Sequence, residues 1–261
     1  MRTNLLAYLL PLGLLAGCGG ADPSSDSASV SAALDSSGQT ANESALMVAT
    51  TTGTEAATSG IEAATMAGGG AKTNWQPAGC VTATENQNVV TYALNDCTGP
   101  YGLVHVTGTV VATFSADSAG IHAELQTNNL HINGATMTLD SKADYTVNGP
   151  AKSLTVNTDG SGTGSFGNTI TRSGKYTLTW NDATACATLD GAWSTGIDNA
   201  TWSTSISNYA QCVAHCPTSG VLSHTGGLSK VTWTVTFDGS AQAKWTSSRG
   251  PSGTFGLLCL P

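Results

Sequence analysis

Apolar and polar residues alternate with a period of two along most of this chain, from about residue 75 onward. The pattern is clearest over residues 104–114, 175–180 and 230–237, where Val, Leu, Ala, Tyr, Trp and Phe occupy one parity and Thr fills most of the other. Such alternation is typical of antiparallel strands with one face in the core and the other in solvent. The sequence therefore predicts an all-β domain over residues 75–261, a large and mostly up-and-down antiparallel sheet of about 10–12 strands. The pattern leaves open whether this sheet forms a barrel, a sandwich or an open curved sheet.

Two turns allow strand registers to be predicted. Asn133-Gly134 is a strong hairpin signal because both residues tolerate a positive φ, and it sets Leu130 opposite Met137. The apolar residues within 121–125 have odd numbers, whereas those within 130–132 have even numbers. A bulge over residues 126–129 is therefore predicted, because one extra residue there would bring both sets onto the same face. A three-residue loop at 238–240 would set Phe237 opposite Ala241, Val235 opposite Ala243 and Trp233 opposite Trp245.

The N-terminus carries an export signal. Residues 1–17 hold one positive charge and then an apolar run that is too short to span a bilayer but has the proportions of a signal-peptide core. The run ends in Leu15-Ala16-Gly17-Cys18, and here the chain resembles the bacterial lipoprotein family.

The resemblance covers about the first 20 residues and implies removal of residues 1–17 as a signal peptide and acylation of Cys18, with palmitate among the acyl chains. Gly19 follows the cysteine, where Asp often marks retention at the inner membrane in this family. The resemblance therefore implies a lipid-anchored protein of the cell envelope, at the outer membrane, on either its periplasmic or its surface face. It implies nothing about the β-domain.

Residues 18–74 have the composition of a flexible tether, since they are rich in Ala, Ser, Thr and Gly and contain almost no aromatic residue. A short helical stretch over 41–49 is an alternative for part of this segment. The whole chain has a net charge of −8 with its Lys and Arg scattered singly, which argues against a nucleic-acid partner.

Six of the seven cysteines lie in the β-domain, and an even number in an exported chain predicts disulfides. Cys80 with Cys97 is the first pair expected, because the two flank a strand. The remaining pairings stay open, as does a weaker metal reading of Cys212-Val-Ala-His215-Cys216. The six residues are Cys80, Cys97, Cys186, Cys212, Cys216 and Cys259.

Candidate binding residues are few. The predicted bulge places His105 opposite His131, with Thr136 beside His131, which makes the two histidines weak candidates for a metal site. Trp193 and Trp202 lie in similar short segments and could stack on sugar rings if they are exposed. Glycoside hydrolysis would need two suitably placed carboxylates, and most of the candidates have a turn role as the alternative; these are Asp140, Asp144, Asp182, Asp190 and Asp238.

No residue pattern nominates a catalytic group or a cofactor. The sequence favours a lipid-anchored envelope protein whose β-domain has a structural or ligand-binding role, attached to the membrane through its covalent lipid. An envelope glycan or protein is the possible partner. The alternatives are a carbohydrate-binding module or glycan-active hydrolase, and a carrier for an apolar ligand.

Overall fold

The computed structural model describes most of the chain after residue 50. The described residues are 51, 53–54, 56–98, 105–127, 130–132, 135–164, 167–181, 183–212, 215–226, 230–257 and 259. The lipoprotein motif at 15–18, the segment 41–49 and Asp182 lie outside them.

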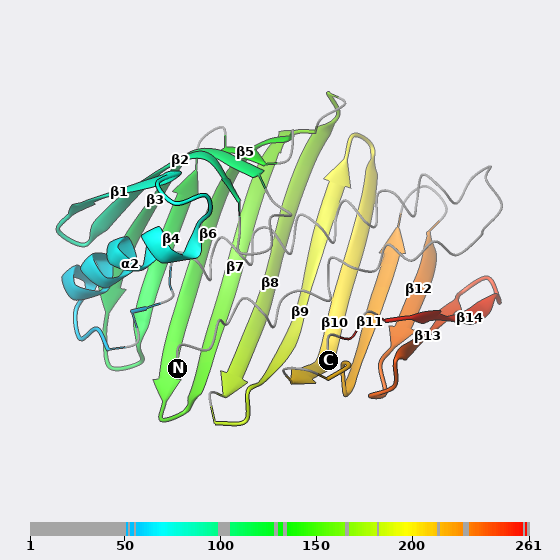
Figure 1. Ribbon diagram of the computed structural model, residues 1–261. Coiled ribbons are helices and arrows are strands. Elements are labelled where there is room, and N and C mark those ends of the chain that lie inside the picture. Colours follow the sequence, from blue (N-terminus) through cyan, green and yellow to red (C-terminus); the bar gives the residue numbers. More distant parts are fainter. Residues whose placement is uncertain are drawn as a thin grey trace.

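The strands form one 14-stranded antiparallel sheet in which nearly every strand pairs with its neighbours in sequence (Figure 1). The exception is β5, which lies beyond the end of β4 and pairs with β3 and β6. The strands are β1 (Val81–Asn86), β2 (Val89–Thr98), β3 (His105–Ala116), β4 (Ile121–Thr127), β5 (Leu130–Ile132), β6 (Ala135–Asn148), β7 (Ala151–Thr163), β8 (Thr169–Asn181), β9 (Cys186–Ile197), β10 (Ala200–Cys212), β11 (Ser219–Gly226), β12 (Val231–Thr236), β13 (Gln242–Ser247) and β14 (Ser252–Gly256).

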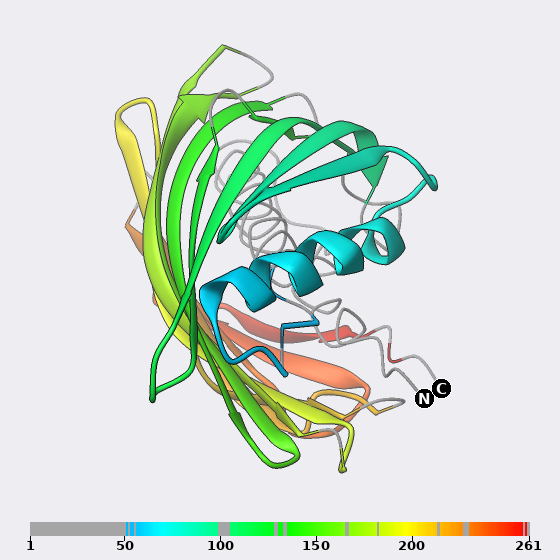
Figure 2. The ribbon, with the colours of Figure 1, turned by 90° about the vertical axis from the view of Figure 1, so that its left-hand side faces the viewer.

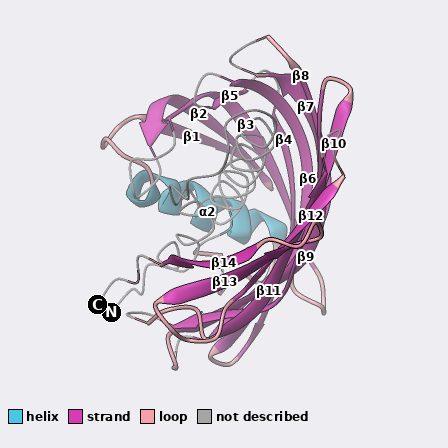
Figure 3. Ribbon diagram, turned by 90° about the vertical axis from the view of Figure 1, so that its right-hand side faces the viewer, coloured by secondary structure: helices cyan, strands magenta, loops and turns pink. Residues whose placement is uncertain are grey.

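The sheet is strongly curved but open, because the path of paired strands begins at β1 and ends at β14. Its concave side curls around the helix α2 (Gly60–Asn74), as Figures 2 and 3 show. The prediction of an all-β, up-and-down sheet is confirmed. Of the barrel, the sandwich and the open curved sheet that the pattern left open, the structure has the open curved sheet. It has more strands than predicted, since β5 is a separate short strand and β14 follows the predicted strand after residue 240.

Helix α2 corrects the predicted boundary between tether and domain at residue 75. Ser59 caps the helix by accepting a hydrogen bond from the Glu62 amide at 3.2 Å, and Glu62 accepts one from the Thr58 amide at 2.8 Å. Four alanines of the helix are fully buried against the sheet, so this segment belongs to the folded unit; they are Ala63, Ala64, Ala67 and Ala71. The composition misled because alanine buries little area per residue, yet it favours helix and permits close packing.

The register predicted for the hairpin at 133–134 is confirmed, although the two turn residues themselves are outside the described residues. Leu130 pairs with Met137 and Ile132 with Ala135. The predicted bulge is also confirmed as a one-residue shift: β3 pairs with β4 through Val110 and Thr127, and with β5 through Val106 and Ile132.

The register predicted after Phe237 is wrong by two residues. Val235 pairs with Trp245 rather than Ala243, and Trp233 pairs with Ser247 rather than Trp245. The Phe237 amide donates to the Gly220 carbonyl of β11 at 3.0 Å, so residue 237 continues the pairing of β12 with β11. The connection between β12 and β13 is longer as a result. Parity is unchanged by a two-residue shift, so the predicted apolar residues still face the core side.

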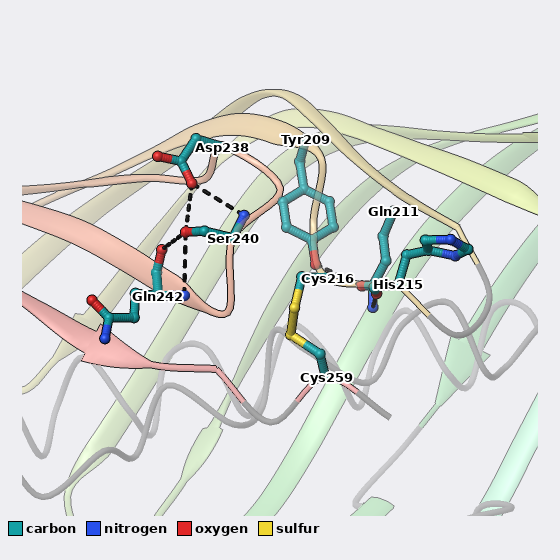
Figure 4. The surroundings of a disulfide bond; sticks show 8 residues. All are labelled: Tyr209, Gln211, His215, Cys216, Asp238, Ser240, Gln242 and Cys259. Atoms are coloured by element: carbon teal, nitrogen blue, oxygen red, sulfur yellow. Dashed lines mark hydrogen bonds between the residues drawn. A yellow bond between two sulfur atoms is a disulfide. The ribbon is translucent and has the colours of Figure 1, made fainter. Parts of the chain in front are cut away.

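Three disulfides crosslink the sheet, and each joins cysteines that are consecutive in sequence. Cys80 bonds Cys97, as predicted. The pairings that the sequence left open are Cys186–Cys212, which joins paired positions on β9 and β10, and Cys216–Cys259. Figure 4 shows the last bond beside Tyr209 and His215; the Cys212–Cys216 metal reading is wrong, because both thiols are taken by disulfides.

Candidate functional site

The concave face carries the apolar parity of nearly every strand. Along β8, Tyr176, Leu178 and Trp180 are all at most 6 % exposed, and they belong to one core cluster with the alanines of α2. Their neighbours Thr177 and Thr179 lie on the opposite, convex face. Side chains alternate between faces along a strand, so this one cluster follows the sheet from β1 to β13.

Helix α2 covers only one end of this face. It contacts β1, β2, β3 and β4 and has no comparable contact with later strands. The packing there is tight: a Cβ built on Gly60 would lie 2.4 Å from the carbonyl oxygen of Phe114. Small residues on the helix therefore let its backbone approach the sheet and fill this end.

Beyond the helix, two adjacent cross-strand rows of the concave face carry buried polar and aromatic side chains. One row runs through Arg172 on β8, Thr195 on β9 and Trp202 on β10. The next row runs from Gly174 through Trp193 and Thr204 to His224 on β11. We call six of these residues the polar patch: Arg172, Trp193, Thr195, Trp202, Thr204 and His224, all at most 8 % exposed.

Two threonines orient the charged and titratable members of the polar patch. Arg172 Nη1 donates to Thr195 Oγ1 at 3.3 Å, and the guanidinium carbon lies 5.9 Å from the centre of the Trp193 ring. Thr204 Oγ1 and His224 Nδ1 are 2.8 Å apart. Burial lowers the pKa of His224 below its ordinary value, which favours the neutral imidazole.

Glycines make room for both indoles. Gly174 pairs with Trp193, and a Cβ there would come within 2.5 Å of the Trp193 Cβ. Gly226 pairs with Trp202, and a Cβ there would lie 2.8 Å from the Trp202 Cδ1. Each bulky ring therefore lies against a neighbouring strand that has no side chain at that position.

Three polar atoms of the patch have no hydrogen-bond partner among the described residues. They are Nε1 of Trp193, Nε1 of Trp202 and Nε2 of His224. Buried polar groups in folded proteins are paired in the large majority of cases. The Tyr92 hydroxyl elsewhere in the core is unpaired in the same sense, so what sets the polar patch apart is that three such atoms lie on neighbouring strands.

Trp193 and Trp202 are buried, with exposed fractions of 4 % and 7 %, so the condition on which sugar stacking depended is not met and both rings pack in the core instead. Sequence reasoning singled out these two residues but for stacking on an open surface. It missed Arg172 and His224. The available signal was their parity, because both occupy apolar-face positions of their strands, His224 directly after Leu222 in that alternation.

The structure does not bring His105 and His131 together. His131 pairs with Thr107 rather than His105, because the one-residue bulge shifts the register in the direction opposite to the predicted one. Nδ1 of His105 is 2.9 Å from an oxygen of Asp96. His131 does contact Thr136 as expected, with Nδ1 3.1 Å from the hydroxyl. Within the described residues no three His, Cys, Asp or Glu side chains gather as metal ligands would.

The convex face is polar and largely self-satisfied. Threonines on neighbouring strands hydrogen-bond in pairs, Thr155 with Thr177 at 3.0 Å and Thr225 with Thr232 at 2.7 Å. A shallow depression of about 450 Å³ over β8–β11 is lined on this face by small side chains such as Ser194. It offers hydroxyls but no aromatic ring on its own face for a sugar to stack on.

The carboxylates considered for glycoside hydrolysis also lie apart from the concave face. Asp140 and Asp144 are strand residues of β6 on the convex side rather than turn residues. Asp190 accepts the Asn208 amide at 2.7 Å and thereby supports the bulge in β10. Asp238 has the turn role, bonding Ser240 and Lys244.

Among the described residues, no helix has both the length and the hydropathy needed to cross a bilayer. Searches with this chain against protein-family models, curated proteins and solved structures find no match.

Proposed function

We propose that this chain is a lipid-anchored lipoprotein of the bacterial cell envelope, acylated at Cys18 at the outer membrane, whose curved sheet binds an apolar ligand along its concave face. The lipid anchor is supported by the motif at 15–18. The binding role is supported by the concave face: one apolar cluster of nearly fully buried side chains continues from β1 to β13, while α2 contacts only β1–β4.

Carbohydrate binding is less favoured than an apolar ligand, because the two tryptophans proposed for it are buried on the concave side. Among the described residues, the depression over β8–β11 on the convex face has no aromatic ring on that face for a glycan to stack on. A concave, largely apolar site with a few polar groups is the usual form of a small-molecule site. A carrier for an apolar ligand is therefore the best-supported function.

The carrier role is tested on exported protein with Cys18→Ser, which keeps the whole mature chain but removes its own acyl groups. Organic extraction followed by mass spectrometry should recover a co-purified lipid. The delipidated protein should bind N-phenylnaphthylamine saturably, with a rise in its fluorescence. Absence of both co-purified lipid and saturable binding contradicts the carrier role.

Two neighbouring residues of β11 provide a matched pair of variants. Leu222 is buried on the concave face and Val221 is 39 % exposed on the convex face. Leu222→Gln should weaken probe binding by about tenfold or more, because the lost apolar contact is worth about 1.5–3 kcal/mol. Val221→Gln should leave binding within about twofold of the parent. Circular dichroism checks that both variants are folded.

The lipid anchor is tested separately. Labelled palmitate should be incorporated into the parent chain and not into Cys18→Ser, and only the parent should sediment with membranes. Incorporation of palmitate into the Ser variant would contradict acylation at residue 18.

A further inference from the structure

Helix α2 closes one end of the concave face, as Figure 2 shows, so a ligand that enters there has to pass the helix. The helix contacts β1, β2, β3 and β4, and side chains of these strands are fully enclosed, with Val90, Val110 and Phe114 each 0 % exposed. An apolar ligand therefore reaches this end of the face only after part of α2 has moved.

Both ends of α2 are fastened to the rest of the molecule. At its start, the Ser59 hydroxyl accepts a hydrogen bond from the Glu62 amide at 3.2 Å. Just after its end, Trp75 is 4 % exposed, and Gln76 exchanges two backbone hydrogen bonds with Thr98. Because neither end is free, an opening of α2 has to occur between them, by local unwinding.

The C-terminal half of the helix is weak between these fixed ends. It contains three successive glycines, Gly68–Gly70. Each glycine in a helix interior disfavours helix formation about four- to fivefold relative to alanine, or about a hundredfold for all three. The buried side chains of this half, Ala67 and Ala71, add one methyl group each, and burial of one such group is worth about fourfold. Two methyl groups do not offset three glycines, so this half is expected to have low local stability.

Packing requires one of these glycines but not its neighbour. A Cβ built on Gly68 would clash with the Glu85 side chain, whereas a Cβ built on Gly69 would meet no atom within 4 Å. Alanine would therefore fit at residue 69 and strengthen the helix. Gly69 keeps the helix weak without a steric reason, and such local conflicts are expected where function needs them.

A tyrosine on a strand that α2 covers gives an independent indication that the closed state is not fully satisfied. Tyr92 lies on the concave face of β2 at 1 % exposure, and its hydroxyl has no hydrogen-bond partner among the described residues. Burial, and to a smaller extent the charge of Glu85, raises the pKa of Tyr92, so the hydroxyl keeps its proton. An enclosed, unpaired hydroxyl destabilises the closed state, and water that reached it on opening would pair with it.

We propose that residues 67–71 of α2 are a gate, which unwinds locally while both ends of the helix stay fastened and thereby admits an apolar ligand to the concave face. This inference rests on the proposed carrier function and names how its site opens. Gly69 sets how often the gate is open, and the fastened ends return it to the closed state.

Amide hydrogen exchange on the Cys18→Ser protein tests the opening without a ligand. The amides of 67–71 should exchange at least about a hundredfold faster than the slowest amides of β2 and β3. Gly69→Ala should slow them about four- to fivefold. Gly256→Ala is the matched control and should leave them unchanged, because a Cβ there also meets no atom within 4 Å and β14 is at the other end of the sheet. Exchange of 67–71 as slow as that of β2 and β3 would overturn the gate, as would equal effects of the two variants.

Stopped-flow fluorescence with N-phenylnaphthylamine tests whether the ligand passes this gate. In Gly69→Ala both association and dissociation should slow about four- to fivefold, while the Kd stays within about twofold of the parent. Gly256→Ala should keep the parent rates. Unchanged rates in Gly69→Ala would overturn the gate and leave the carrier function intact. Failure of the parent to bind the probe would overturn the carrier function and the ligand's passage with it, whereas the exchange measurement still decides whether 67–71 unwind.

Discussion

The two faces of the sheet are built on the same strands but place their polar groups in different environments. On the convex face, threonines meet threonines across strands and hydrogen-bond each other, as Thr155 does with Thr177. On the concave face, Trp193, Trp202 and His224 keep polar atoms without a partner in the described structure. Thr195 pairs with Trp202 and Thr204 pairs with Trp193, so hydroxyl groups lie on the strands next to both indoles. A lack of small polar residues therefore does not explain the unpaired atoms.

Two histidines show the same contrast. His122 on the convex face lies between two carboxylates: Nδ1 is 2.6 Å from Asp144, and Nε2 is 3.1 Å from Asp117. These carboxylates raise the pKa of His122. Burial lowers the pKa of His224. The comparison teaches that neighbouring carboxylates on the convex face favour the charged form of a histidine, whereas burial on the concave face favours the neutral form.

The largest difference between the faces should appear on truncation of neighbouring residues of β3. Phe114 is fully buried on the concave face beneath α2, and Thr113 is half-buried on the convex face. Phe114→Ala should lower the free energy of unfolding by about 3–5 kcal/mol, because it removes packing and leaves a cavity. Thr113→Ala should change it by about 0.5 kcal/mol. Urea denaturation of both variants, under oxidising conditions, measures the two values; similar losses would contradict a core confined to the concave side.

A smaller effect is expected in the pH dependence of stability. The folded-state pKa of His122 is raised, so its stabilisation is fully present below pH 6.5 and is lost as the pH rises through that raised pKa. The folded-state pKa of His224 is lowered, so its contribution is present above pH 6.5 and is lost as the pH falls through that lowered pKa.

Urea midpoints measured from pH 5 to pH 8.5 separate the two histidines. His122→Gln should remove the loss of stability on the alkaline side of pH 6.5, and His224→Phe should remove the loss on the acidic side. If both variants altered the same limb of the profile, the opposite environments of the two faces would be refuted.

The smallest expected effect concerns one hydroxyl pair of the convex face. Thr155→Val and Thr177→Val each keep the branched shape and remove one hydroxyl of a 3.0 Å hydrogen bond. Each single change should cost about 0.2–1 kcal/mol, and the pair should show a coupling energy in the same range. A double-mutant cycle from urea midpoints gives the coupling; a coupling of zero would mean that the convex hydroxyls are satisfied by water alone.

Local signals in the sequence predicted the elements of the fold, since alternation fixes which residues share a face. The turn at 133–134 gave its register correctly because positive φ favours Asn and Gly there. The register after Phe237 was wrong, because a bond to Gly220 on the other neighbouring strand decides it. Helix α2 was missed because its alanines gain their stability from close contact with a sheet that lies later in the chain.

The candidate site was predictable only in part. Trp193 and Trp202 stood out as residue types, but exposure depends on which side a sheet curves toward, and alternation is silent on curvature. Arg172 and His224 occupy apolar-parity positions, a local conflict that sequence reasoning can detect. Such conflicts are expected at functional sites. The bulge was predicted correctly, yet the placement of His131 opposite Thr107 required its exact register.

The order of the crosslinks has a consequence for how the protein matures. Each of the three disulfides joins two cysteines that are consecutive along the chain, at 80–97, 186–212 and 216–259. Nearly every strand likewise pairs with the strand just before it. A chain that enters an oxidising compartment N-terminus first can therefore complete each bond as soon as its second thiol arrives. Random oxidation of six thiols would reach this set in about one of 15 arrangements, whereas sequential oxidation reaches it without a reshuffling step.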